Sequence, residues 1–319
     1  MDRRQLLVAT VAGSFALAID RRGFAAGLGG GPVALVTADL ESHVVVLYLP
    51  SAEVSARIKT APGPRSIEVA HGLTAVVAHT EHGVVSILDA GGVRAELDAF
   101  EAPRYTAVHP DRRIAYVTDS ASEQVVALNF DHGEVLWRTR VPGPARHISI
   151  SPDGATIWTA LGTKAARVAV LDSSDPQRPK LVRTFAPPFL GHDVAFAPDG
   201  RHIWVSSGSH RQIALYRADS RRPVRTLAAD APPQHVTFAR GRAFVASGDD
   251  GTVRRHRLGG ELVRAVRVPI GSYNVASGSG HVVTPSLDQG TVSLIDRDGR
   301  VRTVRVARAA HDACVVAGP

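Results

Sequence analysis

The chemistry available to this chain lies in its histidine, carboxylate and arginine side chains. Two His-Asp pairs, His192–Asp193 and His311–Asp312, open the similar phrases GHDVAFAPDG and AHDACVVAGP, more than a hundred residues apart. Imidazole and carboxylate groups transfer protons and bind divalent metals, so these pairs predict acid–base chemistry or metal ligation. The sequence has no GxSxG elbow or P-loop, and its single cysteine, Cys314, excludes an intramolecular disulfide and CxxC sites.

The composition indicates an all-β protein. Hydrophobic residues make up 44% of the 319 residues, and 29 glycines and 20 prolines punctuate short runs rich in valine. Such runs predict short strands joined by turns, with few helices. The net charge of +7 is mild for this length and disfavours nucleic acid as a partner.

Internal repeats organise residues 31–319 as one domain. The segment divides into seven units of 39 to 46 residues, each with the same four phrases, as in AYVTD, VVALN, VLWRTRV and HISISPDG of one stretch. Short alternating strands with Asp-Gly turns predict antiparallel four-stranded sheets, which cannot bury both faces alone. Aromatic residues at one aligned position should fill the gaps between sheets: Tyr116, Trp158, Trp204 and Phe244.

The phrases AYVTDSASEQVVALN and SPDG resemble the YVTN-type repeats of bacterial seven-bladed β-propellers. The resemblance implies that each SPDG phrase is the innermost strand of a blade and that the following YVTN-like phrase is the next strand outward. The phrase AHDACVVAG would then be the innermost strand of the blade whose other strands lie within residues 34–60. We therefore expect the C-terminal strand to pair with the N-terminal blade and close the ring.

Aligning the seven innermost strands places polar residues at two successive positions, before the strands become apolar. The first position, here called the first layer, holds Arg65, Arg104, Arg146, His192, Gln234, Tyr273 and His311. The next position, the second layer, holds Ser66, Tyr105, His147, Asp193, His235, Asn274 and Asp312. Both layers should lie at one mouth of the central channel, where propellers commonly bind ligands.

These layers predict a binding site that is uneven around its circumference. Three arginines from consecutive blades could bind an anion through paired N–H groups, opposite a half rich in histidine and aspartate. The predicted ligand-binding residues are Arg65, Arg104, Arg146, His147, His192, Asp193, His235, Tyr273, Asn274, His311 and Asp312. Zn²⁺ or another divalent metal could instead be held by a subset of these: His192, Asp193, His235, His311 and Asp312. Alternatively, the polar residues simply face solvent where strands begin.

Two further clusters carry weaker signals. The phrase HTEH, with His79, Glu81 and His82, falls in a loop on the same face but lacks the helical HExxH spacing, so it is a weak metal candidate. Arginines between Arg211 and Arg267 could form a basic flank for a protein partner.

Residues 1–30 read as a signal peptide followed by a Gly-rich linker. A basic start, an apolar stretch from Leu6 to Ile19 and small residues near Ala25 are typical of a cleaved export signal, and the stretch is too short to span a bilayer comfortably. The phrase DRRQLL resembles the twin-arginine signal, which implies export of the folded protein to the periplasm, the cell wall or the medium.

The sequence thus favours an exported, monomeric propeller that captures a small anion or a divalent metal, without enzymatic activity. Exported zinc-carrying propellers that serve importers are similar in fold and ligand type. Propeller lactonases and an antibiotic-ring lyase are also similar, so an enzyme is the first alternative. A protein-interaction platform of the cell envelope is the second.

Overall fold

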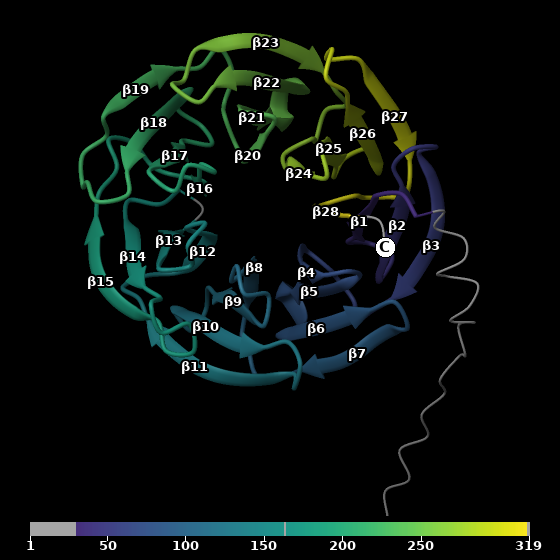
Figure 1. The fold of residues 1–319 in the computed structure, drawn as a ribbon, viewed down its shortest axis with the longest axis horizontal. Helices are drawn as coiled ribbons and strands as arrows, with labels where there is room; N and C mark the ends of the chain where they lie inside the picture. The colour runs from purple at the N-terminus through teal and green to yellow at the C-terminus, as the bar shows by residue number, and fades with distance from the viewer. Residues whose placement is uncertain (1–29, 163, 318–319) are drawn as a thin grey trace, which may run out of the picture.

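The computed structural model describes residues 30–162 and 164–317, and these form a closed ring of seven four-stranded antiparallel sheets (Figure 1). The predicted seven-bladed propeller is confirmed. The predicted signal in residues 1–30 lies, apart from Gly30, outside the described residues. Within the described ranges, no helix has the length and apolar character needed to cross a bilayer.

Each blade contributes one strand to each of four concentric layers. The innermost strands are β28 (Ala313–Val316), β4 (Ser66–His71), β8 (Pro103–Val108), β12 (Ala145–Ile150), β16 (Val194–Phe196), β20 (Val236–Ala239) and β24 (Ala276–Gly278). The second strands are β1 (Val33–Ala38), β5 (Thr74–His79), β9 (Ile114–Asp119), β13 (Thr156–Leu161), β17 (His202–Ser206), β21 (Arg242–Ser247) and β25 (His281–Ser286).

The outer half of each blade is less buried. The third strands are β2 (His43–Tyr48), β6 (Val84–Asp89), β10 (Gln124–Asn129), β14 (Val168–Asp172), β18 (Gln212–Arg217), β22 (Thr252–Arg257) and β26 (Thr291–Ile295). The outermost strands are β3 (Glu53–Lys59), β7 (Gly92–Leu97), β11 (Glu134–Arg140), β15 (Lys180–Phe185), β19 (Arg225–Ala228), β23 (Leu262–Arg267) and β27 (Val301–Arg305). Two short 3₁₀ turns, η1 (Thr80–His82) and η2 (Gly248–Asp250), follow β5 and β21.

The ring closes as the resemblance implied. β28 pairs antiparallel with β1, with Val316 opposite Val33 and Ala313 opposite Val36. The pairing continues beyond the strand, because the Thr37 amide donates to the carbonyl of Asp312 at 2.9 Å. A closed ring leaves no blade with an uncovered face, which explains why β1, β5 and β9 are buried along their whole length.

Large aromatic side chains fill the gaps between blades, as predicted. Tyr116, Trp158 and Trp204 are completely buried, and Phe244 is nearly so. Trp158 of one blade contacts Tyr216 of the next, with ring centroids 5.6 Å apart in an edge-on arrangement. These contacts set the spacing of the blades around the channel, as expected of aromatic residues in the core.

Candidate functional site

The structure has a central chamber of about 580 Å³, and the two polar layers are placed differently with respect to it. Every member of the second layer lines the chamber, together with the innermost strands that follow it, and no member of the first layer does. The first layer therefore lies beyond the end of the chamber, on the face where the innermost strands begin. We call this face the mouth.

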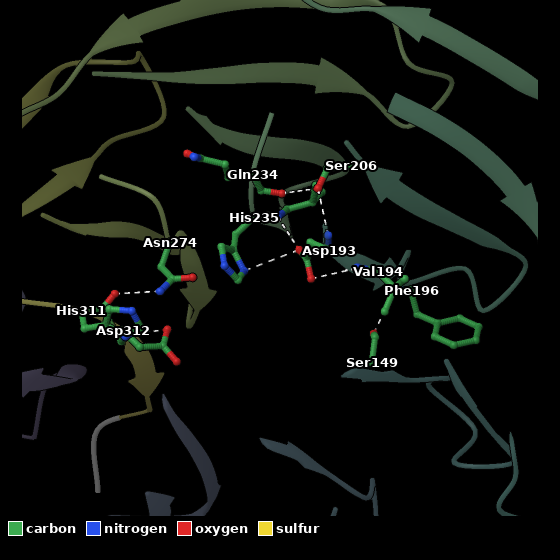
Figure 2. Close-up of polar contacts among 12 residues, drawn as sticks. Ser149, Asp193, Val194, Phe196, Ser206, Gln234, His235, Asn274, His311 and Asp312 are labelled. Carbon is green, nitrogen blue, oxygen red and sulfur yellow. Dashed lines mark hydrogen bonds and ion pairs between the residues drawn. The ribbon is translucent and has the colours of Figure 1, made fainter. Parts of the chain in front are cut away.

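The second-layer carboxylates tie neighbouring blades together (Figure 2). Asp193 accepts hydrogen bonds from the amide of Val194, at 2.9 Å, and from that of Val236 in the next blade, at 3.0 Å. Asp312 repeats the arrangement with Ala313 at 2.9 Å and with Ile67 at 3.1 Å. Two innermost strands cannot hydrogen-bond to each other across the channel wall, so one carboxylate supplies acceptors to both.

The amide of Asn274 has a similar bridging role. Its Nδ2 donates to the carbonyl of His311 at 2.7 Å, which links the seventh blade to the first. The first-layer residues of the neighbouring blades contact the mouth-side turns: Gln234 accepts from the amide of Gly248 at 2.7 Å, and the ring of Tyr273 packs against the same glycine. Asn274 and Tyr273 thus contact adjacent blades, whereas the bond between Gly248 and Gln234 lies within one blade.

Burial raises the pKa of both bridging carboxyl groups. The pKa of Asp193 rises to about 7 and that of Asp312 to about 6, because loss of solvent outweighs the stabilising amide bonds. The metal set expected from the sequence, with His192, Asp193, His235, His311 and Asp312, is not assembled as one group among the described residues.

Three histidines from consecutive blades do converge: His147 and His235 from the second layer and His192 from the first. Their ligand atoms all lie within 4.8 Å of one another. The ring centroid of His147 lies 4.4 Å from that of His192 and 4.7 Å from that of His235. Across residues 30–162 and 164–317, this is the one group of three or more histidine, cysteine or acidic side chains close enough to share a metal ion.

Two imidazoles of the cluster, those of His147 and His235, are held in the neutral form. Burial, and then the neighbouring imidazoles, lower the pKa of His147 and of His235 well below the usual value. Both nitrogens of His147 are buried, and the backbone of His192 is among the polar groups that act on its ring. The Nδ1 of His235 lies 3.7 Å from a carboxylate oxygen of Asp193 (Figure 2). Buried, neutral imidazole nitrogens are the donors that a transition metal requires.

Irregular backbone brings these side chains together. The pairing of β12 with β13 shifts register between Ala145 and Ile148, and Arg146 and His147 occupy the shift. The pairing of β8 with β9 shifts in the same way around Arg104 and Tyr105. Bulges of this kind re-aim side chains. Tyr105 consequently stacks on His147 with ring centroids 4.0 Å apart.

Sequence reasoning placed His147 among the ligand-binding residues but not among the metal ligands. The signal was available, because His147, His192 and His235 fall in three consecutive repeats. The alignment also grouped His311 with His192, and the structure separates them. The Nδ1 of His311 donates a hydrogen bond to the carbonyl of Arg65 at 2.6 Å, and burial lowers the pKa of His311 to about 4.

One residue of each of the two further clusters is held within the fold. His79 is fully buried, with Nδ1 3.0 Å from the carbonyl of Pro62 and Nε2 2.9 Å from the hydroxyl of Ser86, so both its nitrogens are engaged. In the basic flank, Arg254 is buried against the carboxylates of Asp230 and Asp250. Cys314 is a buried free thiol within the closing strand, in agreement with a packing role.

Neither known protein families nor curated proteins give a match to this chain. Solved structures do. A functionally unknown protein from Desulfotomaculum acetoxidans is 14% identical, with a TM-score of 0.79 over 90% of this chain and 99% of that one. Apo AztD from Citrobacter koseri is 13% identical, with a TM-score of 0.71 over 91% of this chain and 98% of that one.

A virginiamycin B lyase from Staphylococcus aureus is 12% identical, with a TM-score of 0.65 over 76% of this chain and 84% of that one. At such low identity, the likeness extends to the fold and no further. By its architecture and by these similarities, the chain is a seven-bladed β-propeller.

Proposed function

We propose that this protein is an exported binding protein that holds a divalent transition metal, with Zn²⁺ as the first candidate, through His147, His192 and His235. The observation that carries the proposal is the convergence of three largely buried imidazoles whose ligand atoms lie within 4.8 Å of one another. Burial removes the imidazole of His147 from water, and a bound ion would offset the free-energy cost of that desolvation.

The donor set favours particular metals. Imidazole nitrogen suits Zn²⁺, Cu²⁺, Ni²⁺ and Co²⁺, whereas Mg²⁺ and Ca²⁺ prefer oxygen. Three protein ligands leave one position of a tetrahedral ion for water or for an atom of another molecule. Asp193, beside His235, would orient that imidazole and increase its basicity, as carboxylates near metal-binding histidines commonly do.

Export is the second part of the proposal. The twin-arginine-like DRRQLL phrase supports transport of a folded chain, and a folded chain can carry a metal acquired before export. The chamber and the mouth give the imidazole cluster two sides, so a bound ion could be offered to a protein partner at either face of the ring.

Metal binding is tested by calorimetric titration of the metal-stripped protein with Zn²⁺ and Co²⁺, together with elemental analysis of the protein as purified. We expect one ion per chain. His147→Ala and His235→Ala should abolish binding, whereas His132→Ala, at an exposed turn, should not. At a metal concentration 100 times Kd, binding adds about 2.7 kcal/mol to the free energy of unfolding, a shift that the cluster variants should lose.

Failure of the wild type to bind either ion would refute the proposal. The enzymatic alternative is tested separately, because a metal ion with an open position can also activate water for catalysis. Turnover of a lactone panel by the metal-loaded protein, lost in His147→Ala and retained in His132→Ala, would favour the lactonase or lyase alternative.

A further inference from the structure

Three arginines line the mouth beside the imidazole cluster. Arg65 immediately precedes β4, Arg104 lies in β8 and Arg146 lies in β12, and β8 packs between β4 and β12. All three belong to the first layer, as His192 does, so they lie outside the chamber and on the mouth side of His147 and His235. The chain therefore places three positive charges on neighbouring strands at one arc of the ring.

Nearby carboxylates balance these charges only in part. Arg65 lies 3.6 Å from Asp39, and the charge of Glu81 also acts on Arg104. Burial, then the charges of Arg146 and Arg65, lower the pKa of Arg104, which shows that the guanidinium groups repel one another. The Nε atoms of Arg65 and Arg104 are buried without a hydrogen-bond partner among the described residues.

Two of the arginines are sequence neighbours of residues in or beside the imidazole cluster. Arg146 directly precedes His147, and Arg104 directly precedes Tyr105, which stacks on His147 at 4.0 Å. Both pairs lie at the bulges that redirect their side chains. A molecule at the mouth would therefore meet the guanidinium groups and a metal on the histidines together.

We propose that the site binds its metal together with a small oxyanion, a carboxylate or a phosphate. This inference rests on the proposed metal site. One oxygen of the anion takes the position that three histidines leave open, and the remaining oxygens accept hydrogen bonds from the guanidinium groups of Arg65, Arg104 and Arg146. A guanidinium group presents paired N–H donors that match carboxylate and phosphate oxygens, which explains why arginine occupies this arc. The ligand class is thus a divalent metal ion together with a small oxyanion.

The test measures coupling between metal and anion. Co²⁺ is titrated into the metal-stripped protein at buffered free-metal concentration, with and without oxalate or inorganic phosphate, and its visible absorption reports changes in coordination. Because coupling is reciprocal, the anion should tighten Co²⁺ binding by roughly 5- to 150-fold. The two anions distinguish a carboxylate site from a phosphate site.

Arg104→Gln should weaken anion binding by roughly ten- to a hundredfold, the usual effect of losing a charge-assisted hydrogen bond. Arg65→Gln is the second variant, and Arg221→Gln, at an exposed turn, is the matched control. Without anion, Arg104→Gln should bind Co²⁺ as tightly as the wild type or more tightly, because a repelling charge has been removed. A merely destabilised protein would bind the metal more weakly.

The outcomes separate the two proposals. Coupling that is lost in both arginine variants and kept in Arg221→Gln supports the joint site. Binding of Co²⁺ with no effect of either anion overturns this inference and leaves the metal site intact. Absence of Co²⁺ and Zn²⁺ binding in the wild type overturns both.

Discussion

The bridging carboxylate of Asp312 gives a stability prediction whose size depends on pH. In Asp312→Ala, the amides of Ile67 and Ala313 lose acceptors at 3.1 and 2.9 Å. Each buried donor without a partner costs about 1–3 kcal/mol, so the lost bonds amount to about 2–6 kcal/mol. This is the full effect when the carboxyl group is protonated in the folded protein.

When the buried carboxyl group is ionised, its desolvation destabilises the folded wild type, so removing the group costs less. The rise in the pKa of Asp312 from 3.8 to about 6 corresponds to about 3 kcal/mol, at about 1.4 kcal/mol per pKa unit. Because the folded-state pKa lies above the unfolded one, the contribution of the group is fully present below about pH 4 and is lost as the pH rises through about 6. Asp312→Ala should therefore cost about 3 kcal/mol more at about pH 4 than at about pH 8.

Urea unfolding of the wild type and of Asp312→Ala at both pH values measures this difference. Asp219→Ala is the control, because that carboxylate is 75% exposed and pairs only with Arg217 at the surface. The control should differ from the wild type by less than about 1 kcal/mol at either pH. A cost of Asp312→Ala that is the same at both pH values would refute the reasoning about burial, and no cost at either would refute the bridging role.

Two further predictions concern the ring itself. Trp204→Ala removes a fully buried side chain between blades and should lower the free energy of unfolding by about 3–5 kcal/mol in urea unfolding, with Trp137→Ala, which is 44% exposed, as the milder comparison. Ending the chain at Ala310 removes β28 and uncovers β1, with a loss of roughly 5 kcal/mol or more from burial alone, comparable to the stability of many domains. The chain ending at Ala310 should be aggregated or protease-sensitive. A chain ending at Ala317 should instead elute as a compact monomer in size-exclusion chromatography. Equal behaviour of the two chains would contradict the argument that β28 closes the ring.

The fold could be predicted because every repeat restates it. Burial, turn chemistry and strand length recur seven times, and the echo between GHDVAFAPDG and AHDACVVAGP located the closing strand. The echo also explained the aspartates in part, since Asp193 and Asp312 do hold equivalent positions. Their shared role, a bridge between amides of adjacent blades, required coordinates.

The site was harder to predict because alignment fixes the position around the ring but not the direction of a side chain. His192 and His311 are aligned, yet one joins the imidazole cluster and the other contacts a backbone carbonyl. The bulge at Arg146 and His147 shifts the strand by one residue, and no turn residue in the sequence announces it. Convergence of side chains from different blades is therefore a property of the assembled ring.

Closure by β28 also constrains how the protein acquires its structure. The bonds between Thr37 and Asp312 join residues 275 positions apart, so the first blade stays incomplete until nearly the whole domain has been synthesised. Until then, β1 presents an edge that could pair with another chain, and the half-built ring is vulnerable to swapped dimers. A circularly permuted gene that starts at β4 and ends at β3 would make all seven blades contiguous, and its faster refolding would show that this long-range pairing limits assembly.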